Sequence, residues 1–399
     1  MRRAVPRLPA AIWALGGVSL LMDVSSEMIH SLLPVFLVTG LGASIVTVGF
    51  IEGAAEAMAS ITKLFSGWIS DHMGRRKPLT VLGYAISAAS KPFFPLASSA
   101  LTVLAARLTD RLGKGVREAP RDALLAELTP AGASGAAFGL RQSLDTLGAV
   151  GGPLLAVALM ALFSGDVRRV FAWAVAPAVL AVVLMIFGVR EPDKTAANNR
   201  VRPVLRWSMA RDLGPAVWWI IALSAAFSLA RFSEAFLLLR GRSLHVALGD
   251  IPWIMVLMNL VYALTAAPAG RLSDRIGRRS LLAGGMAVLI LADAALAFAP
   301  NLAVLGVGVA LWGLHLGLTQ GLLASLVADA APPRLRGGAF GVFYLVTGLV
   351  LLAGGVAAGA LWGALGPRAV FLIGGALALG ALLMLVLTSR PRSAAASGD

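Results

Sequence analysis

The chain has 399 residues, of which 58% are hydrophobic and 14% are charged, with a formal net charge of +14. Soluble domains are about one quarter charged, and apolar stretches long enough to cross a bilayer recur along this chain, so we predict a helical membrane protein embedded in a lipid bilayer. The absence of cysteine excludes disulfides and thiolate chemistry. Most basic residues lie in short loops between apolar stretches, which indicates membrane orientation and not nucleic-acid binding.

The apolar stretches predict two successive sets of transmembrane helices. In chain order the twelve predicted spans are 10–37, 44–66, 78–98, 100–126, 136–162, 170–188, 216–239, 251–269, 280–299, 302–327, 338–362 and 368–388. Lys and Arg gather in the loops on the side that carries both termini, so we expect both termini to be cytoplasmic and the protein to lie in the cell (inner) membrane.

The longest polar stretch divides the predicted spans into two halves. It covers 189–215 and predicts a cytoplasmic linker between an N-terminal six-helix bundle, 1–188, and a C-terminal one, 216–388. Residues 389–399, rich in Ser, Ala and Arg, predict a disordered tail.

Two motifs recur half a chain apart. GWISDHMGRRKPL begins at residue 67 and GRLSDRIGRRSLL begins at residue 270; GAAFG at 135–139 matches GGAFG at 337–341, and Glu127 corresponds to Asp329. The matching residues of the longer motif are Gly67, Asp71, Gly74, Arg75 and Arg76 in the first half, and Gly270, Asp274, Gly277, Arg278 and Arg279 in the second. The repeat indicates two six-span units in parallel order, a plan that transporters use.

The longer motif resembles the signature loop G-x3-D-x2-G-R-[RK] of the major facilitator superfamily, and the resemblance, to the twelve-span bacterial type, covers essentially the whole chain. It implies an all-α membrane protein with twelve transmembrane helices in two pseudo-symmetric six-helix bundles, working as a monomer. It also implies that the ten motif residues form gating loops that hold the two halves together in the outward-facing state. The alternative is that their charges only fix the topology.

The fifth predicted span carries a second resemblance. Gly139, Gly148, Gly152 and Pro153 resemble the G-x8-G-x3-G-P motif of superfamily exporters, although Ala156 and Val157 stand where that motif ends in a glycine pair. Small residues at this spacing permit close helix contact. The motif favours export, and the alternative is a generic packing face that importers also have.

Charged residues follow one face of the fourth predicted span. They recur every three or four residues, as Arg107, Arg111, Lys114, Glu118 and Arg121. A charge at membrane depth costs about 2.5–3.5 kcal/mol on insertion scales, so these side chains should face the interior and have partners.

Two hypotheses for these charges stay open. In the first, the basic face binds an anionic substrate while Asp23, Glu27, Glu52 or Glu56 exchanges protons. In the second, the charges pair with one another and hold spans one, two and four in register. The resemblance implies that spans one, four, seven and ten line a central cavity, so the substrate candidates are Arg107, Arg111, Lys114, Arg231, His315 and Gln320.

We therefore expect a secondary active transporter of a small solute that works by alternating access, with proton-coupled efflux (an antiporter) as the preferred function. One alternative is a proton-coupled importer of an organic anion or metal chelate. The other is a membrane sensor or assembly subunit that does not transport. The sequence shows no catalytic cluster, no metal-ligand spacing and no G-x4-G-K-[ST] loop, so we expect no enzymatic activity, no metal and no cofactor.

Overall fold

The computed structural model describes residues 8–73, 75–130, 132–191, 213–332 and 335–388, and their secondary-structure elements are all helices. In chain order these are α1 (Ala10–His30), α2 (Leu33–Val35), the π-helical turn η1 (Phe36–Gly40), α3 (Ile45–Met73), α4 (Lys77–Ser90), α5 (Phe93–Leu96), α6 (Ala100–Leu128), α7 (Ser134–Leu162), α8 (Val167–Trp173), α9 (Val175–Gly188), α10 (Pro215–Ala230), α11 (Ala235–Ser243), the 3-10 turn η3 (Leu248–Asp250), α12 (Pro252–Ile276), α13 (Arg278–Phe298), α14 (Leu302–Thr319), α15 (Leu322–Ala330), α16 (Arg336–Leu365) and α17 (Pro367–Leu387). Most of the predicted linker and all of the predicted tail lie outside the described residues.

Within the described residues these helices form twelve membrane-spanning units in the predicted order, which confirms the predicted fold class. Ten of the units are long and apolar enough to cross a membrane by length and composition. The other two are α4 with α5, which is short and broken, and α6, which carries charges through its middle. The second span was predicted to end at residue 66, whereas α3 continues to Met73. A hydropathy pattern marks the apolar part of a helix and not its polar extension.

Five of the described spans are broken into two helical pieces, and three of the breaks lie inside spans one, seven and ten. In span one the chain leaves the helix at Ser31, and Pro34 restarts it as α2. In span ten Gly321 adopts a left-handed conformation with φ +76° between α14 and α15, which a residue with a side chain rarely adopts. In span seven residues 231–234 separate α10 from α11 without any Pro or Gly.

The exposed surface of the bundle is apolar, while charged residues are buried. Side chains such as Phe187 and Leu387, each 78% exposed, are typical of helices that face lipid. Arg107, Lys91 and Glu52, by contrast, are each 1% exposed. Ionisable groups buried at membrane depth need partners, and these partners define the site described below.

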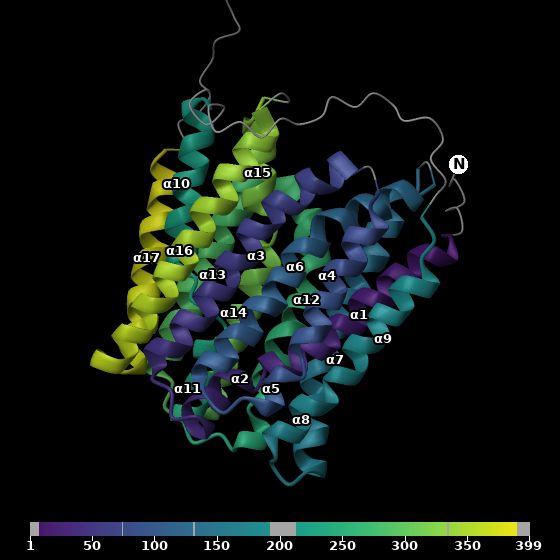
Figure 1. The fold of residues 1–399 in the computed structure, drawn as a ribbon. Coiled ribbons are helices and arrows are strands. Elements are labelled where there is room, and N and C mark those ends of the chain that lie inside the picture. Colours follow the sequence, from purple (N-terminus) through teal and green to yellow (C-terminus); the bar gives the residue numbers. More distant parts are fainter. Residues whose placement is uncertain (1–7, 74, 131, 192–212, 333–334, 389–399) are drawn as a thin grey trace, which may run out of the picture.

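The two halves meet along two helix pairs, α3 with α16 and α7 with α12 (Figure 1). Glycines allow the first approach: a Cβ on Gly53 would lie 2.9 Å from the backbone oxygen of Leu351, and one on Gly359 would lie 2.7 Å from that of Ile45. In the second pair the amide nitrogen of Asn259 donates to the backbone oxygen of Ala149 at 2.9 Å.

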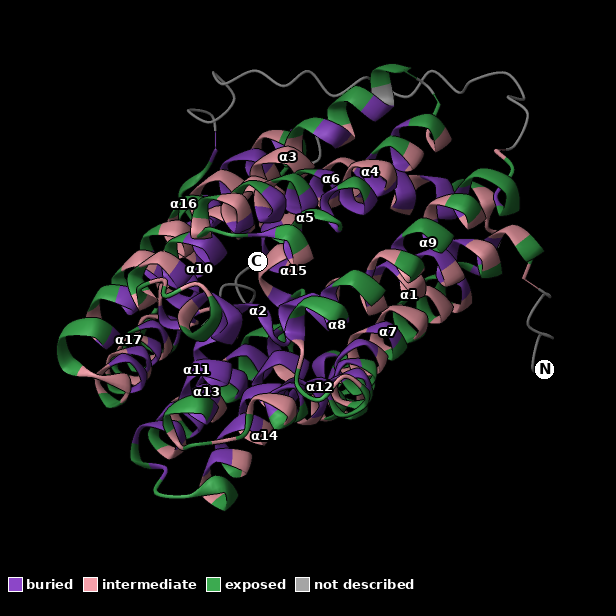
Figure 2. Ribbon diagram, turned by 60° about the horizontal axis from the view of Figure 1, so that its bottom comes forward, coloured by how far each residue is buried: buried purple, intermediate pink, exposed green. Residues whose placement is uncertain are grey.

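The two ends of the bundle differ. We call the end near residues 191 and 213, where the chain passes between the halves, the linker face, and the other end the far face. Figure 1 places α2, α5, α8 and α11 at the far face. There α2 contacts α11 across the two halves, and the far end of α7 contacts η3 (Figure 2). These contacts join the halves at the far face.

Candidate functional site

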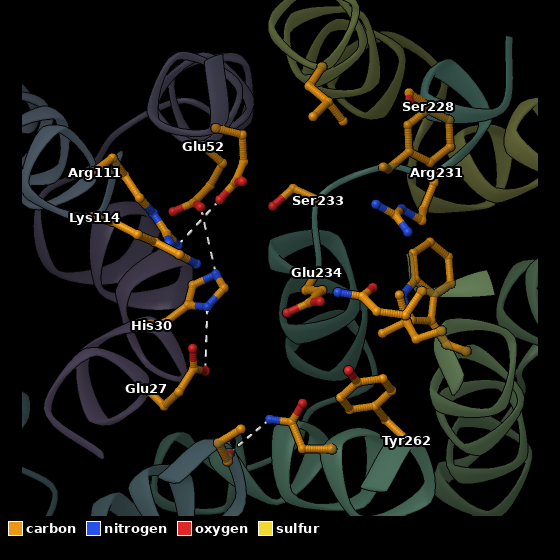
Figure 3. A pocket seen from close by; sticks show the side chains of 18 of the residues that line it. Glu27, His30, Glu52, Arg111, Lys114, Ser228, Arg231, Ser233, Glu234 and Tyr262 are labelled. Atoms are coloured by element: carbon orange, nitrogen blue, oxygen red, sulfur yellow. Dashed lines mark hydrogen bonds and ion pairs between the residues drawn. The ribbon is translucent and has the colours of Figure 1, made fainter. Parts of the chain in front are cut away.

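A cavity of about 400 Å³ lies between the two halves. Its walls come from spans one, two, four and five of the first half and from spans seven, eight, ten and eleven of the second. The ionisable residues that line it are Asp23, Glu27, His30, Glu52, Glu56, Arg111, Lys114, Asp145, Arg231, Glu234 and Tyr262. Figure 3 shows Glu27, His30 and Glu52 on one wall, with Ser233 and Glu234 across the cavity from them. Ionisable side chains at membrane depth are costly, so each of these charges requires an explanation.

His30 connects two carboxylates on the first-half wall. Its Nδ1 lies 3.6 Å from Glu27 and its Nε2 lies 3.6 Å from Glu52. Arg107 then donates to Glu52 at 2.8 Å, and both of these side chains are 1% exposed. The four groups form a continuous charged chain through α1, α3 and α6. Its close contact is the one between Arg107 and Glu52, whereas both ring nitrogens of His30 are buried without a hydrogen-bond partner among the described residues.

The remaining charges of α6 are also largely paired. Lys91 of the third span lies 2.9 Å from Asp110, and Arg111 lies 3.3 Å from Glu56. Arg117 donates to Ser87 at 2.5 Å. The charges therefore join α6 to α3, two of the spans in the second hypothesis, and also to α4, a span that the hypothesis did not include; the transport role of each residue stays a prediction.

Two first-half charges at the cavity are exceptions. Among the described residues, Asp23 has neither a hydrogen bond nor an ion pair within 4 Å. Lys114 has one acidic neighbour, Glu118, at 3.9 Å, and Glu118 lies closer to Lys63, at 3.0 Å. Asp23 and Lys114 are thus the first-half lining groups whose charges are least compensated.

The second-half wall is built at the break in span seven. Arg231 is the residue at which α10 ends, and Glu234 is the residue just before α11. Both line the cavity, and neither has a hydrogen bond from its side chain or an ion pair among the described residues. Ser233 accepts a hydrogen bond from the backbone of Ala235 at 3.3 Å, which helps α11 to restart. Ser233 was not among the predicted site residues, because a break without Pro or Gly leaves no recognisable signal in the sequence.

Two of the predicted substrate candidates do not line the cavity. Arg107 lies behind Glu52, to which it is paired. His315 is fully buried in α14, with Nδ1 2.6 Å from the backbone oxygen of Trp312. His315 was predicted to line the cavity, but Trp312, one turn away on the same helix, lines it instead. Arg111, Lys114, Arg231 and Gln320 line the cavity as predicted.

The glycines of α7 determine how closely α1 approaches. A Cβ on Gly148 would lie 2.8 Å from the Cβ of Asp23, and one on Gly152 would lie 2.7 Å from the Cβ of Glu27. Both approaches are closer than a real Cβ permits, so the two glycines hold the acidic face of α1 against α7. Gly139 has open space at its Cβ position, and Pro153 lies inside the helix.

The predicted gating loops form similar ion pairs in the two halves, but from neighbouring motif positions, because Arg278 matches Arg75 and not Arg76 in the repeat. Arg76 lies 3.3 Å from Glu127, and Arg278 pairs with Asp329; both pairs span 51 residues of sequence. Glu127 and Asp329 are the residues that the sequence repeat matched. Each pair joins the loop after the second span of its half to the end of the fourth.

Other loop residues add contacts in the same region. The backbone N–H of Arg76 donates to Glu191 at 2.5 Å, and the guanidinium of Arg279 lies over the ring of Trp219 at 5.4 Å. Gly277 has φ +85° where α12 ends. Gly74 and the side chain of Asp71 lie outside the described residues. The remaining predicted loop residues, Gly67, Arg75, Gly270 and Asp274, lie at or near the linker-face ends of α3, α4 and α12.

Twelve spans in two similar halves around a polar cavity define the fold of a membrane transporter. The family model of the Major Facilitator Superfamily matches residues 15–241 and 232–398. The chain therefore belongs to the Major Facilitator Superfamily of transporters.

Three similarities extend this assignment. An uncharacterized MFS-type transporter of Methanocaldococcus jannaschii is 32% identical over 383 residues, which cover 94% of each chain. The tetracenomycin C resistance and export protein of Streptomyces glaucescens is 32% identical over 149 residues, or 37% of this chain and 28% of that one. The crystal structure of a point mutant of the nucleoside transporter NupG superposes with a TM-score of 0.81 at 14% identity, covering 95% of this chain and 100% of that one. At that identity the structural likeness shows the fold alone.

Proposed function

We propose that the protein is a proton-coupled secondary transporter that exports a small polar solute by alternating access. The observation that carries this proposal is the charged cavity between two halves that touch at the far face. A solute site at the interface of two repeats is what a rocking mechanism requires, because each half can then open to one side of the membrane in turn. Closure at the far face corresponds to a state that opens toward the linker face, which we propose to be cytoplasmic.

Asp23 is the proposed proton carrier. It lines the cavity, it has no ion-pair partner among the described residues, and it lies one turn of α1 before Glu27, the first member of the His30 chain. A carboxylate without a fixed partner can gain or lose a proton without disrupting the fold, whereas Glu52 is held by Arg107. Glu27 and His30 are proposed to pass the proton between Asp23 and the buried end of the network, and Glu56 to hold Arg111.

The glycine motif of α7 and the partial similarity to an export protein support export. Import of an organic anion is favoured by a single observation, the lining positions of Arg111 and Lys114. Arg111 is already neutralised by Glu56, so the anion hypothesis rests mainly on Lys114.

Solute-dependent proton movement in proteoliposomes tests the proposal. The purified protein is reconstituted with a pH-sensitive dye inside, and amino acids, dipeptides, organic acids and organic amines are added in turn. We expect at least one solute to move protons through wild type, and Asp23→Asn to reduce that movement by at least about tenfold, or about 1.4 kcal/mol of barrier. The matched control is Asp166→Asn, since Asp166 is a half-exposed acid at the far face and does not line the cavity.

Each outcome has a defined meaning. If Asp23→Asn carries protons as well as wild type does, Asp23 is not the carrier. If solutes bind but neither they nor protons cross the membrane, the protein is a sensor and the transport proposal fails. If the solute accumulates in the same direction as the protons, the protein imports its solute.

A further inference from the structure

Four charges at the cavity have no oppositely charged group closer than 3.9 Å among the described residues. Glu52 is neutralised by Arg107, Glu56 by Arg111 and Asp145 by Arg141, at 2.8, 3.3 and 3.0 Å, and Glu27 lies 3.6 Å from His30. Among the described residues, the lining charges that keep no close partner are Asp23, Lys114, Arg231 and Glu234. They are two acids and two bases, so the negative and positive charges without close partners are equal in number.

The four charges are divided evenly between the two halves. Asp23 on α1 and Lys114 on α6 belong to the first-half wall, and Arg231 and Glu234 flank the break of span seven on the second-half wall. Figure 3 shows Lys114 on one side of the cavity, with Glu234 and Arg231 across from it. Each wall therefore presents toward the other one acid and one base that have no close ion-pair partner among the described residues.

The break in span seven explains how its two charges persist without partners in the described structure. Arg231 lies at the C-terminal end of α10, where the helix dipole favours a cation. Glu234 lies at the N-terminal end of α11, where it favours an anion. Helix ends thus stabilise both charges while leaving the side chains free to contact a ligand.

Closure of the cavity around a solute removes water from these four groups, and each then needs a compensating charge. A solute with a single charge compensates at most one kind of group and leaves the opposite kind without a partner. A solute with one cationic and one anionic group compensates both kinds and joins the two walls.

We infer that the solute is amphoteric, an amino acid or a short peptide-like zwitterion, which places its cationic group at Glu234 and Asp23 and its anionic group at Arg231 and Lys114. This inference rests on the proposed transport function, whose cavity it uses. The cavity volume of about 400 Å³ accommodates more than a single amino acid. Trp312 and Tyr262 on the second-half wall give an apolar side chain a surface to pack against.

Thermal unfolding of the detergent-purified full chain tests the inference, because a ligand that binds the folded state raises the melting temperature. The probes are the L-amino acids with uncharged side chains and a set of dipeptides built from them. Each is compared with its methyl ester, which keeps only the cation, and its N-acetyl form, which keeps only the anion. We expect at least one zwitterion to bind at least about tenfold more tightly than both of its blocked forms.

Two variants test which cavity residue binds the cationic group of the solute and which binds the anionic group. Glu234→Gln should weaken binding of the zwitterion by at least about tenfold while leaving the N-acetyl form unchanged, and Arg231→Gln should do the same while leaving the ester unchanged. The matched controls are Asp250→Asn and Arg242→Gln, since both residues lie at the far face outside the cavity lining. The controls should bind the zwitterion as wild type does.

The inference is overturned if an ester or an N-acetyl form binds as tightly as its parent, or if no zwitterion in the panel stabilises the protein. Its failure is distinguishable from failure of the proposed function. A singly charged solute that binds and moves protons in proteoliposomes would contradict the amphoteric substrate class and still support proton-coupled transport. A zwitterion whose binding depends on Glu234 and Arg231 as expected, but which drives no flux, would support the amphoteric ligand and contradict proton-coupled transport.

Discussion

The two halves share one fold but use their charges differently. In the first half most of the buried charges are paired across three helices, as in the contact between Arg107 and Glu52 at 2.8 Å, and Asp23 is the exception among the described residues. In the second half Arg231 and Glu234 face the cavity without ion pairs in the described structure. Asp293, on α13, is fully buried and has no hydrogen-bond partner there. A repeat can thus preserve helix packing while one copy commits most of its buried charges to ion pairs between helices and the other leaves its cavity charges unpaired in the described structure.

The sharpest test of this contrast exchanges one arginine in each half. Arg107→Gln leaves Glu52 buried with only His30, at 3.6 Å, as an ion-pair neighbour, and breaking a buried pair in this way should cost about 3–5 kcal/mol of stability. Arg231→Gln removes a charge that has no ion-pair partner among the described residues, so it should change stability much less. The melting temperatures of the two variants in detergent measure the difference, with Arg242→Gln on the exposed part of α11 as the control. Equal losses for Arg107 and Arg231 would show that the first-half pair is no more structural than the second-half charges.

A second test asks whether the first-half charges depend on close helix packing. Gly152→Ala puts a Cβ within 3 Å of the backbone oxygen of Val24 and of the Cβ of Glu27, so α1 must shift, at a cost of about 1–3 kcal/mol. Gly139→Ala lies in the same motif and on the same helix, but its Cβ meets open space. We expect that variant to be neutral or slightly more stable, since Ala favours the helix.

Melting temperature and solute-driven proton flux are measured for both glycine variants. Because Glu27 moves with α1, Gly152→Ala should lose proton flux as well as stability. A Gly152→Ala protein that melts and transports as Gly139→Ala does would show that this contact does not position the acidic face of α1.

The sequence predicted the spans, their order and the repeat because these depend on local hydropathy and on motifs that recur at one offset. It also predicted that the charges of α6 would need partners, because burial of a charge is costly wherever it occurs. It did not predict which partners. Asp110 and Arg117 lie off the face formed by Arg107, Arg111 and Lys114, yet they contact Lys91 and Ser87. The charged face of α6 in the sequence does not show that neighbouring helices pack on two of its sides, because that depends on the tertiary structure.

The break in span seven was missed for a similar reason. Pro34 and Gly321 mark the breaks in spans one and ten through their own backbone preferences. Residues 231–234 have no such preference, so their break depends on the surrounding helices. The cavity position of His315 failed because a helix periodicity of about 3.6 residues places His315 and Trp312 on nearly the same face, and only packing determines which of the two reaches the cavity.

The smallest expected effect on stability is at the linker face. It tests whether the ion pairs of the two loops act in gating or only in packing. Arg278 and Asp329 are 43% and 61% exposed, so a double-mutant cycle with Arg278→Gln and Asp329→Asn should give a coupling energy of at most about 1 kcal/mol. The first-half pair, Arg76 with Glu127, is less exposed, at 15% and 42%, and Arg76 also contacts Ser70 and Glu191. The coupling energy between Arg76 and Glu127 should therefore be close to about 1 kcal/mol.

Melting temperatures measure both cycles, and proton flux is measured on the same variants. If the loops hold one state of the transport cycle, flux should fall in both halves while the melting temperatures hardly change. If flux instead follows stability in each variant, the loop charges fix topology and packing alone.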